Sequence, residues 1–159
     1  MPNLGSILRD AVVESINAAD CIAATQPPVS AYGYDPGSSD DQIRRKLTES
    51  GLTIMVPLPD CAAQDDADPA RLGFDLTVTI GERSRINRGP TGTGVSPYDL
   101  AWSLAAVLDG RTVEAGWAPL EFQGLEQQQG ADAETRDLYV VEARFRTSCR
   151  YRVTAEAEA

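Results

Sequence analysis

The stretch LYVVEARFRTSCRYRV, residues 138–153, alternates apolar and polar side chains with a period of two. Successive side chains of a β-strand point to opposite faces of a sheet, so this pattern predicts one long strand. One predicted face carries Tyr139, Val141, Ala143, Phe145, Thr147, Cys149, Tyr151 and Val153. The other face carries Glu142, Arg144, Arg146, Ser148, Arg150 and Arg152. The strand therefore has one side suited to a hydrophobic core and one side rich in arginine.

Two shorter strands and two helices are predicted within residues 4–82. Apolar residues recur every three or four positions over 4–18, which predicts an amphipathic helix. A short helix is expected over about 40–50, capped by Ser39 and ended by Gly51. The apolar segment 51–58 and the alternating segment 72–82 predict strands that pair antiparallel.

A second long helix is predicted to begin at Ser96-Pro97-Tyr98-Asp99, which combines a serine cap, a proline at the first position and an acid three residues on. Gly110 ends it, and a further strand is expected over 117–122. Three segments are predicted as irregular: a loop or extended crossing over 26–39, an acidic loop over 59–71, and a flexible arm over 83–95. The polar segment 123–137 is predicted as a long hairpin loop.

These elements predict an α+β fold. The expected sheet is antiparallel or mixed, with about four main strands, and two principal helices pack on one face. Residues 1–153 form the single expected domain, and residues 154–159 form a flexible C-terminal tail. Trp102 and Trp117 are interpreted as core or core-edge residues.

The composition limits the classes of function. With 24 acidic against 14 basic residues, the net charge of −10 argues against wrapping nucleic acid in bulk. The chain has no histidine and three scattered cysteines, so zinc binding and the usual histidine-assisted nucleophilic catalysis are not expected, and no cofactor is predicted. Unpaired thiols fit a reducing compartment. No signal peptide and no membrane-spanning segment are indicated.

Two segments match the sequence patterns of ligand-binding sites only in part. The segment Gly89–Gly94 lies between a predicted strand and a predicted helix, where a phosphate-binding loop belongs, but it lacks the Gly-Lys-Ser/Thr of a P-loop. A flexible loop is the favoured interpretation, and a small-ligand or nucleotide site is the alternative. The acidic pairs Asp40-Asp41 and Asp65-Asp66 are interpreted as capping or solvated residues rather than as a cation site or catalytic carboxylates.

Arginine is concentrated in two places, which hold seven of the 13 arginines of the chain. They are Arg83, Arg85 and Arg88 after the 72–82 strand, and Arg144, Arg146, Arg150 and Arg152 on the last strand. One interpretation is a solvated sheet face with ion pairs inside the chain to Asp75, Glu82 or Glu121. Another is a surface between subunits, because the planar guanidinium binds carboxylates with two parallel hydrogen bonds. Contact with DNA is the third and weakest interpretation.

The order of elements resembles the small tail-terminator, or tail-completion, proteins of long-tailed bacteriophages. The resemblance rests on the opening helix LGSILRDAVVESI, the strand and arm FDLTVTIGERSRINRG, the helix SPYDLAWSLAAVLDG and the closing pair WAPLEFQGL and LYVVEARFRTSCRYRV. It spans about residues 4–153. Within the arm, Glu82 and Asn87 are the polar residues just before the helix, and Asn87 joins the seven arginines as a candidate contact residue.

The resemblance implies a non-enzymatic virion protein that forms a homo-oligomer, expected to be a hexameric ring. Such a ring caps the head-proximal end of the tail tube, stops its growth, and offers a docking surface to a neck or head-completion protein. It would be assembled in the cytoplasm of the host bacterium, and DNA would pass through its lumen without specific binding. Another head–tail joining protein or a minor tail protein is the alternative within the same class.

Overall fold

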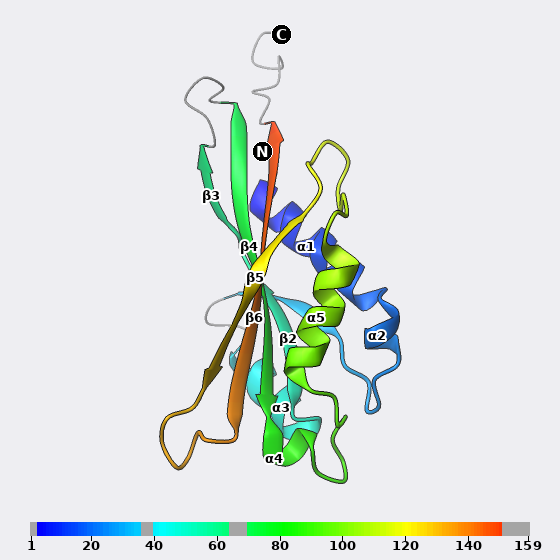
Figure 1. Cartoon of the computed structure of the whole chain (residues 1–159), viewed down its shortest axis with the longest axis vertical. Helices are drawn as coiled ribbons and strands as arrows, with labels where there is room; N and C mark the ends of the chain where they lie inside the picture. Colours follow the sequence, from blue (N-terminus) through cyan, green and yellow to red (C-terminus); the bar gives the residue numbers. More distant parts are fainter. Residues whose placement is uncertain (1–2, 36–39, 64–69, 151–159) are drawn as a thin grey trace.

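The computed structural model describes residues 3–35, 40–63 and 70–150 of the chain (Figure 1). The helices are α1 (Leu4–Asn17), α2 (Asp20–Ala23), α3 (Asp40–Glu49), α4 (Ser84–Asn87) and α5 (Pro97–Leu108). The strands are β1 (Ala31–Tyr34), β2 (Leu52–Pro57), β3 (Asp60–Ala63), β4 (Arg71–Arg83), β5 (Glu121–Gln129) and β6 (Leu138–Arg150).

The strands form one mixed sheet in the order β1-β2-β4-β6-β5, and β3 pairs with β4 beyond the end of β2. β1 and β2 run parallel, and the other neighbours run antiparallel. The longest ladder joins β4 to β6 over all 13 residues of each strand, from Arg71 opposite Arg150 to Arg83 opposite Leu138. The predicted long strand is therefore the neighbour of the predicted 72–82 strand, and the α+β class is confirmed.

One face of the sheet carries the hydrophobic core. The alternation of β4 and β6 places Leu76, Val78, Val141 and Phe145 on this face, and each is at most 1% exposed. α1 and α5 cover the same face (Figure 1), where they bury apolar stripes that include Leu8, Val12 and Ile16 of α1 and Leu100, Leu104 and Leu108 of α5. The expectation of two principal helices on one face is confirmed.

The opposite face is covered only in part. α3 contacts β2 and β4 on that side, and the Lys46 ammonium lies 5.5 Å from the ring centroid of Tyr32. The Tyr32 hydroxyl lies 2.8 Å from Thr53 Oγ1, and Thr53 is only 1% exposed. Burial raises the pKa of Tyr32, against the hydrogen bond to Thr53. α3 therefore closes the β1–β2 end of this face and leaves the β4–β6–β5 end open.

Four elements correct the predictions. β1 lies inside the segment expected to be a loop, β3 lies inside the expected acidic loop, and α4 lies inside the expected flexible arm. The strand expected over 117–122 is instead β5, which covers much of the segment predicted as a hairpin loop; Trp117 only forms an isolated bridge with Cys149. The Ser39 cap, the Asp65-Asp66 pair, Tyr151, Arg152, Val153 and the 154–159 tail lie outside the described residues.

The two ends of the sheet are finished differently. At β1, the Asn17 side chain donates to the carbonyl of Ala31 at 3.0 Å and accepts from its N–H at 2.7 Å, so it takes the place of a neighbouring strand. At β5, the register shifts between Phe122 and Gly124, and the N–H of Phe122 donates to Asp109 Oδ1 at 3.0 Å. Bulges and side-chain caps of this kind discourage uncontrolled strand pairing at an edge.

Candidate functional site

The open part of the outer sheet face holds a network of opposite charges. Arg146 Nε lies 3.1 Å from Asp75 Oδ1 on the neighbouring strand β4. Arg144 pairs with Glu126 on β5, and its guanidinium lies 3.8 Å from Glu142 Oε2. The antiparallel register produces these pairs, because it places Arg146 directly opposite Asp75 and Arg144 close to Glu126. We call Asp75, Glu126, Glu142, Arg144 and Arg146 the arginine face.

A shallow hollow of about 450 Å³ lies over the arginine face. It is lined by Asp60, Asp75, Leu76, Thr77, Gln123, Glu142, Arg144, Phe145 and Arg146. The side chains of Arg144 and Arg146 are 55% and 53% exposed. Exposed ion pairs contribute at most about 1 kcal/mol each, because water screens them. The network therefore orients charged groups toward solvent more than it stabilises the fold.

The other predicted arginines do not join this network. Arg85 Nε lies 3.9 Å from Asp137 Oδ2, and Arg88 Nε lies 3.4 Å from Glu82 Oε2, both around α4 at the other end of β4. Arg83 is half-buried. Arg150 stands opposite Arg71 at the far end of β6, and Arg152 lies outside the described residues. The six of these arginines that the structure describes therefore fall into separate groups rather than one patch.

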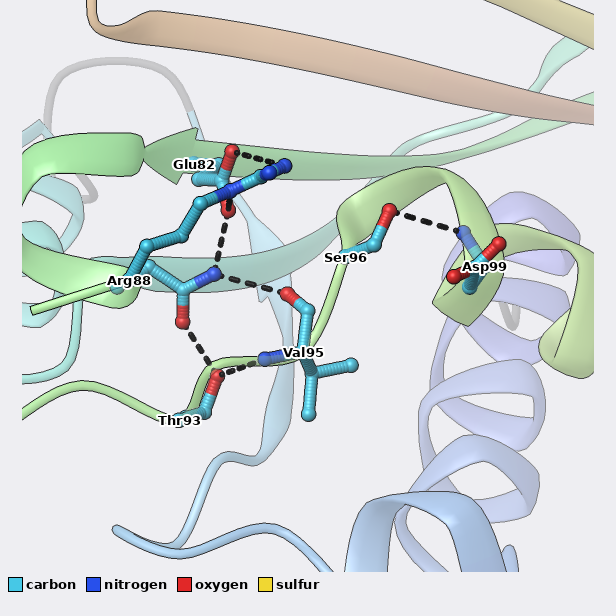
Figure 2. Close-up of polar contacts among 7 residues, drawn as sticks. Glu82, Arg88, Thr93, Val95, Ser96 and Asp99 are labelled. Atoms are coloured by element: carbon cyan, nitrogen blue, oxygen red, sulfur yellow. Dashed lines mark hydrogen bonds and ion pairs between the residues drawn. The ribbon is translucent and has the colours of Figure 1, made fainter.

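Asn87 is fully buried, so the expectation that it contacts a partner is wrong. Its side-chain amide donates to Glu82 Oε2 at 2.5 Å and to the carbonyl of Val95 at 2.8 Å, and its carbonyl oxygen accepts from Thr93. Figure 2 shows this network with Glu82, Arg88, Thr93 and Val95. Glu82 is only 2% exposed, so Asn87 and Arg88 supply the hydrogen bonds that a buried carboxylate needs.

The glycines of the 89–94 segment serve this buried network. A Cβ on Gly92 would lie 2.1 Å from the carbonyl oxygen of Asn87, so only glycine fits there. The N–H of Gly94 donates to that same oxygen at 2.8 Å, and the N–H of Gly92 donates to Gly89. Backbone donors that a phosphate would need are thus already used within the turn, which argues against the nucleotide-binding alternative.

A ladder of aromatic rings, which the sequence patterns did not single out, runs from the core to the surface. Phe145 is 1% exposed and packs against the half-buried Phe122, which in turn contacts Trp102, each pair with centroids 5.6 Å apart. Trp102 is 49% exposed and meets Tyr98, one turn earlier on α5, at 6.3 Å. Trp117, by contrast, is 8% exposed and packs on Phe74. Trp102 lies outside the apolar stripe of α5, and this is the sequence feature from which its exposure was predictable.

The hairpin loop between β5 and β6 is organised by one acid. Asp132 Oδ1 accepts from the Thr135 hydroxyl at 2.8 Å, from the Thr135 N–H at 3.0 Å and from the Glu134 N–H at 3.1 Å. The hydrogen bonds from Thr135 and Glu134 lower the pKa of Asp132. The loop also joins α4, because the N–H of Ser84 donates to the carbonyl of Asp137 at 2.7 Å.

The acids and thiols of the described part of the chain are not grouped as a metal site. Within it, no group of three or more histidine, cysteine, aspartate or glutamate side chains is placed to hold a metal ion. Burial raises the pKa of the Cys149 thiol, which keeps it protonated at neutral pH, and the charge of Cys61 acts in the same direction. None of the helices described is both long enough and apolar enough to cross a membrane.

Comparison with known proteins shows a shared fold. No protein-family model and no curated protein matches the chain. Among solved structures, it is similar to a chain from the virion of a native gene transfer agent particle, with a TM-score of 0.61 and 17% sequence identity. The match covers 90% of this chain and 94% of the other chain. At this identity the two chains share their architecture over nearly their whole lengths.

Proposed function

We propose that this chain is a structural virion protein that caps the head-proximal end of a phage tail tube as an oligomeric ring and joins it to the neck. The single observation that carries the virion role is the shared architecture with a virion component over nearly the whole of both chains. The finer tail-terminator role rests on the resemblance in the order of elements. A non-enzymatic role agrees with both.

The surface of the molecule supports a ring on physical grounds. A ring requires a heterologous contact, in which one patch of a subunit meets a different patch of the next. The arginine face presents guanidinium and carboxylate groups side by side on a rigid three-stranded platform of β4, β6 and β5. We propose that Arg144 and Arg146 exchange part of their contacts inside the chain for carboxylates of a neighbouring subunit or of the tail tube protein.

The net charge of −10 also suits a protein beside a DNA channel. Like charges repel, so an acidic lumen allows DNA to pass without binding it. The ring would therefore guide the genome between head and tail while its charged outer residues bind the tube and a neck or head-completion protein.

Removal of the gene from a cell that produces the particle tests this role. A tail terminator stops tube growth, so its loss should give tubes of uncontrolled length and heads that lack attached tails. Purified wild-type particles should contain the chain by mass spectrometry, at several copies per particle. Its absence from particles would overturn the virion role.

The alternative within the same class predicts a different phenotype. A head–tail joining protein acts after the tube is complete, so its loss should leave tubes of normal length that fail to join heads. Electron microscopy of tube lengths in the deletion strain, with the gene restored on a plasmid as control, separates the two roles. Tubes of normal length would remove the terminator role and keep the joining role.

A further inference from the structure

The outer edge of β5 carries backbone groups without partners. The N–H of Gly130 donates to the carbonyl of Leu138 at 3.0 Å, at the loop end of the β5–β6 ladder. Because alternate residues of an antiparallel ladder direct their backbone groups to the same side, this bond and the register turn the N–H and C=O groups of Leu125, Gln127 and Gln129 away from β6. β5 is the end strand of the sheet (Figure 1), and within the described residues none of these groups is hydrogen-bonded. We call these groups the open edge.

An aromatic surface lies beside the open edge, on the helix side of the sheet. The register places Phe122 and Leu125 on the face that carries the core. Trp102 of α5 contacts Phe122, with ring centroids 5.6 Å apart, and is 49% exposed. A strand added to β5 would direct every second side chain to this face. The open edge and Trp102 together therefore fit an extended segment in which every second residue is apolar.

Two other stretches of the sheet edge are closed to such a segment. At β1, Asn17 occupies the N–H and the carbonyl of Ala31. At the start of β5, Asp109 accepts from the N–H of Phe122, and the bulge before Gly124 shifts the register. The part of β5 after the bulge remains free.

The chain contains a segment of the required pattern directly after β6. The alternation of β6 continues past Arg150, where the described residues end. The next apolar positions are Tyr151, Val153 and Ala155, and the next polar positions are Arg152 and Thr154. The ladder between β4 and β6 ends at Arg71 opposite Arg150, and β5 begins only opposite Arg146, so no strand of the described chain extends beside this segment. We call residues 151–155 the donor segment.

We propose that the donor segment of one copy pairs as an added strand with the open edge of the next copy. This inference rests on the proposed ring, to which it assigns a lateral contact. Donor and acceptor are different segments of one chain, so the contact is heterologous and repeats around a ring. Tyr151 and Val153 then cover Trp102, whose residue type often dominates the energy of a protein interface.

The two segments cannot meet within one chain. Leu125 stands opposite Ala143, seven residues before Arg150, which is about 23 Å back along β6. Val153 follows Arg150 by three residues and reaches at most about 11 Å from it. The rest of the open edge lies farther away along the same strand. The donor segment therefore needs a second copy as its acceptor.

Gln127→Pro tests the open edge. Proline removes the outward N–H of residue 127, whereas the ladder to β6 keeps its hydrogen bonds. Gln127→Ser is the matched control, because it removes the same side chain and its bond to the Tyr139 hydroxyl but keeps the N–H. In native mass spectrometry the wild-type chain and Gln127→Ser should form oligomers, and Gln127→Pro should be monomeric. Similar thermal midpoints of the two variants serve as the fold control.

A second pair of variants tests the donor segment. Tyr151→Ser combined with Val153→Ser should weaken self-association at least about 100-fold, because it removes the apolar area that the contact buries. Arg152→Ser combined with Thr154→Ser places the same new side chains at the polar positions and should change the association constant less than about fivefold. Sedimentation equilibrium measures both constants. Equal effects of the two double variants would overturn the inference.

Mixing the variants gives the decisive result. Gln127→Pro keeps its donor segment, and the Tyr151→Ser, Val153→Ser variant keeps its open edge, so each pair of unlike copies can form one contact. The mixture should contain 1:1 dimers that grow no further, because both free ends of such a dimer are inactive. A monomeric wild-type chain, oligomers of either variant alone, or a mixture that stays monomeric would overturn the inference.

Tryptophan fluorescence locates the contact. Trp117 is 8% exposed and packs on Phe74, so Trp102 is the solvent-exposed one of the two tryptophans. Mixing should shift the emission to shorter wavelength and reduce its quenching by acrylamide, because Tyr151 and Val153 exclude water from Trp102. Dimers with unchanged emission would overturn the inference. Absence of the dimers, with the chain still present in particles, would remove this contact and leave the proposed function standing.

Discussion

Asn87 joins three parts of the chain that are separated by irregular backbone. Its amide binds the carboxylate of Glu82 at the end of β4 and the carbonyl of Val95 just before α5. Gly51 and Gly92 lie so close to Asn87 that an added Cβ would approach its backbone within 2.2 Å and 2.1 Å. One buried side chain thus fixes how the arm leaves the sheet and how the next helix begins.

Substitution of Asn87→Ala should lower the free energy of unfolding by about 3 kcal/mol, because it leaves the buried Glu82 carboxylate with only the longer contacts to Arg88, both at 3.4 Å. The matched control is Asn3→Ala, which removes an exposed helix cap at 3.2 Å from the Ser6 N–H and should cost about 1 kcal/mol. Urea denaturation measures both losses. Similar losses for the two variants would contradict the role assigned to Asn87.

At the scale of elements, regular alternation was predictable and polar edge strands were not. In β4 and β6, apolar residues recur at every second position along the face that packs on the helices, and the sequence shows this period. β5 reads EFQGLEQQQ and lies at the edge of the sheet with mainly exposed side chains. Seven of its nine residues are not apolar, so the sequence shows no apolar alternation from which a strand is predicted. β1 and β3, with four residues each, are too short for a period to emerge.

The candidate contacts follow the same rule. Asp75 and Glu82 were predictable as partners of arginines because they lie on or beside β4, whose position was clear. Glu126 was not predictable as a partner of an arginine, because its segment was predicted as a loop. It forms the ion pair with an arginine of β6 that the sequence analysis expected of Glu121. The buried state of Asn87 depends on the close approach of Gly92 in the following turn and of Gly51, which is distant in the sequence, and no local pattern records the approach of Gly51.

The start of α5 offers a prediction at the same scale. Ser96 Oγ accepts from the N–H of Asp99 at 3.4 Å, as the sequence predicted (Figure 2). Ser96→Ala should therefore reduce the free energy of unfolding by about 1 kcal/mol. Ser103→Ala changes an exposed serine within the same helix and should have an effect of less than about 0.5 kcal/mol. Thermal unfolding of the two variants compares them directly; a larger loss for Ser103→Ala would count against the cap.

At the scale of the whole molecule, the core and the charged surfaces are divided between the two faces of one sheet. α1 and α5 bury one face, α3 covers one end of the other, and the arginine face occupies what remains. This division means that the charged face can change without disturbing the core. Stability and assembly should therefore respond to different substitutions.

Charge reversal on the arginine face tests that separation. Arg144→Glu and Arg146→Glu should each change the free energy of unfolding by about 1 kcal/mol or less, because the ion pairs are exposed, yet each should impair binding to neighbouring subunits or to the tail tube. Arg111→Glu, an exposed reversal on the loop after α5, is the control and should leave assembly intact. Co-sedimentation with assembled tubes measures the binding. Normal binding by both variants would exclude the arginine face as a contact surface.

The amide of Asn17 has a consequence for copies of the chain that meet in solution. At high concentration, unpaired edge strands of different copies pair with one another and form fibrils. By occupying both backbone hydrogen-bonding groups of Ala31, Asn17 leaves less of the edge of β1 open to the backbone of a second copy. Crowded copies should therefore resist fibril formation through the edge of β1.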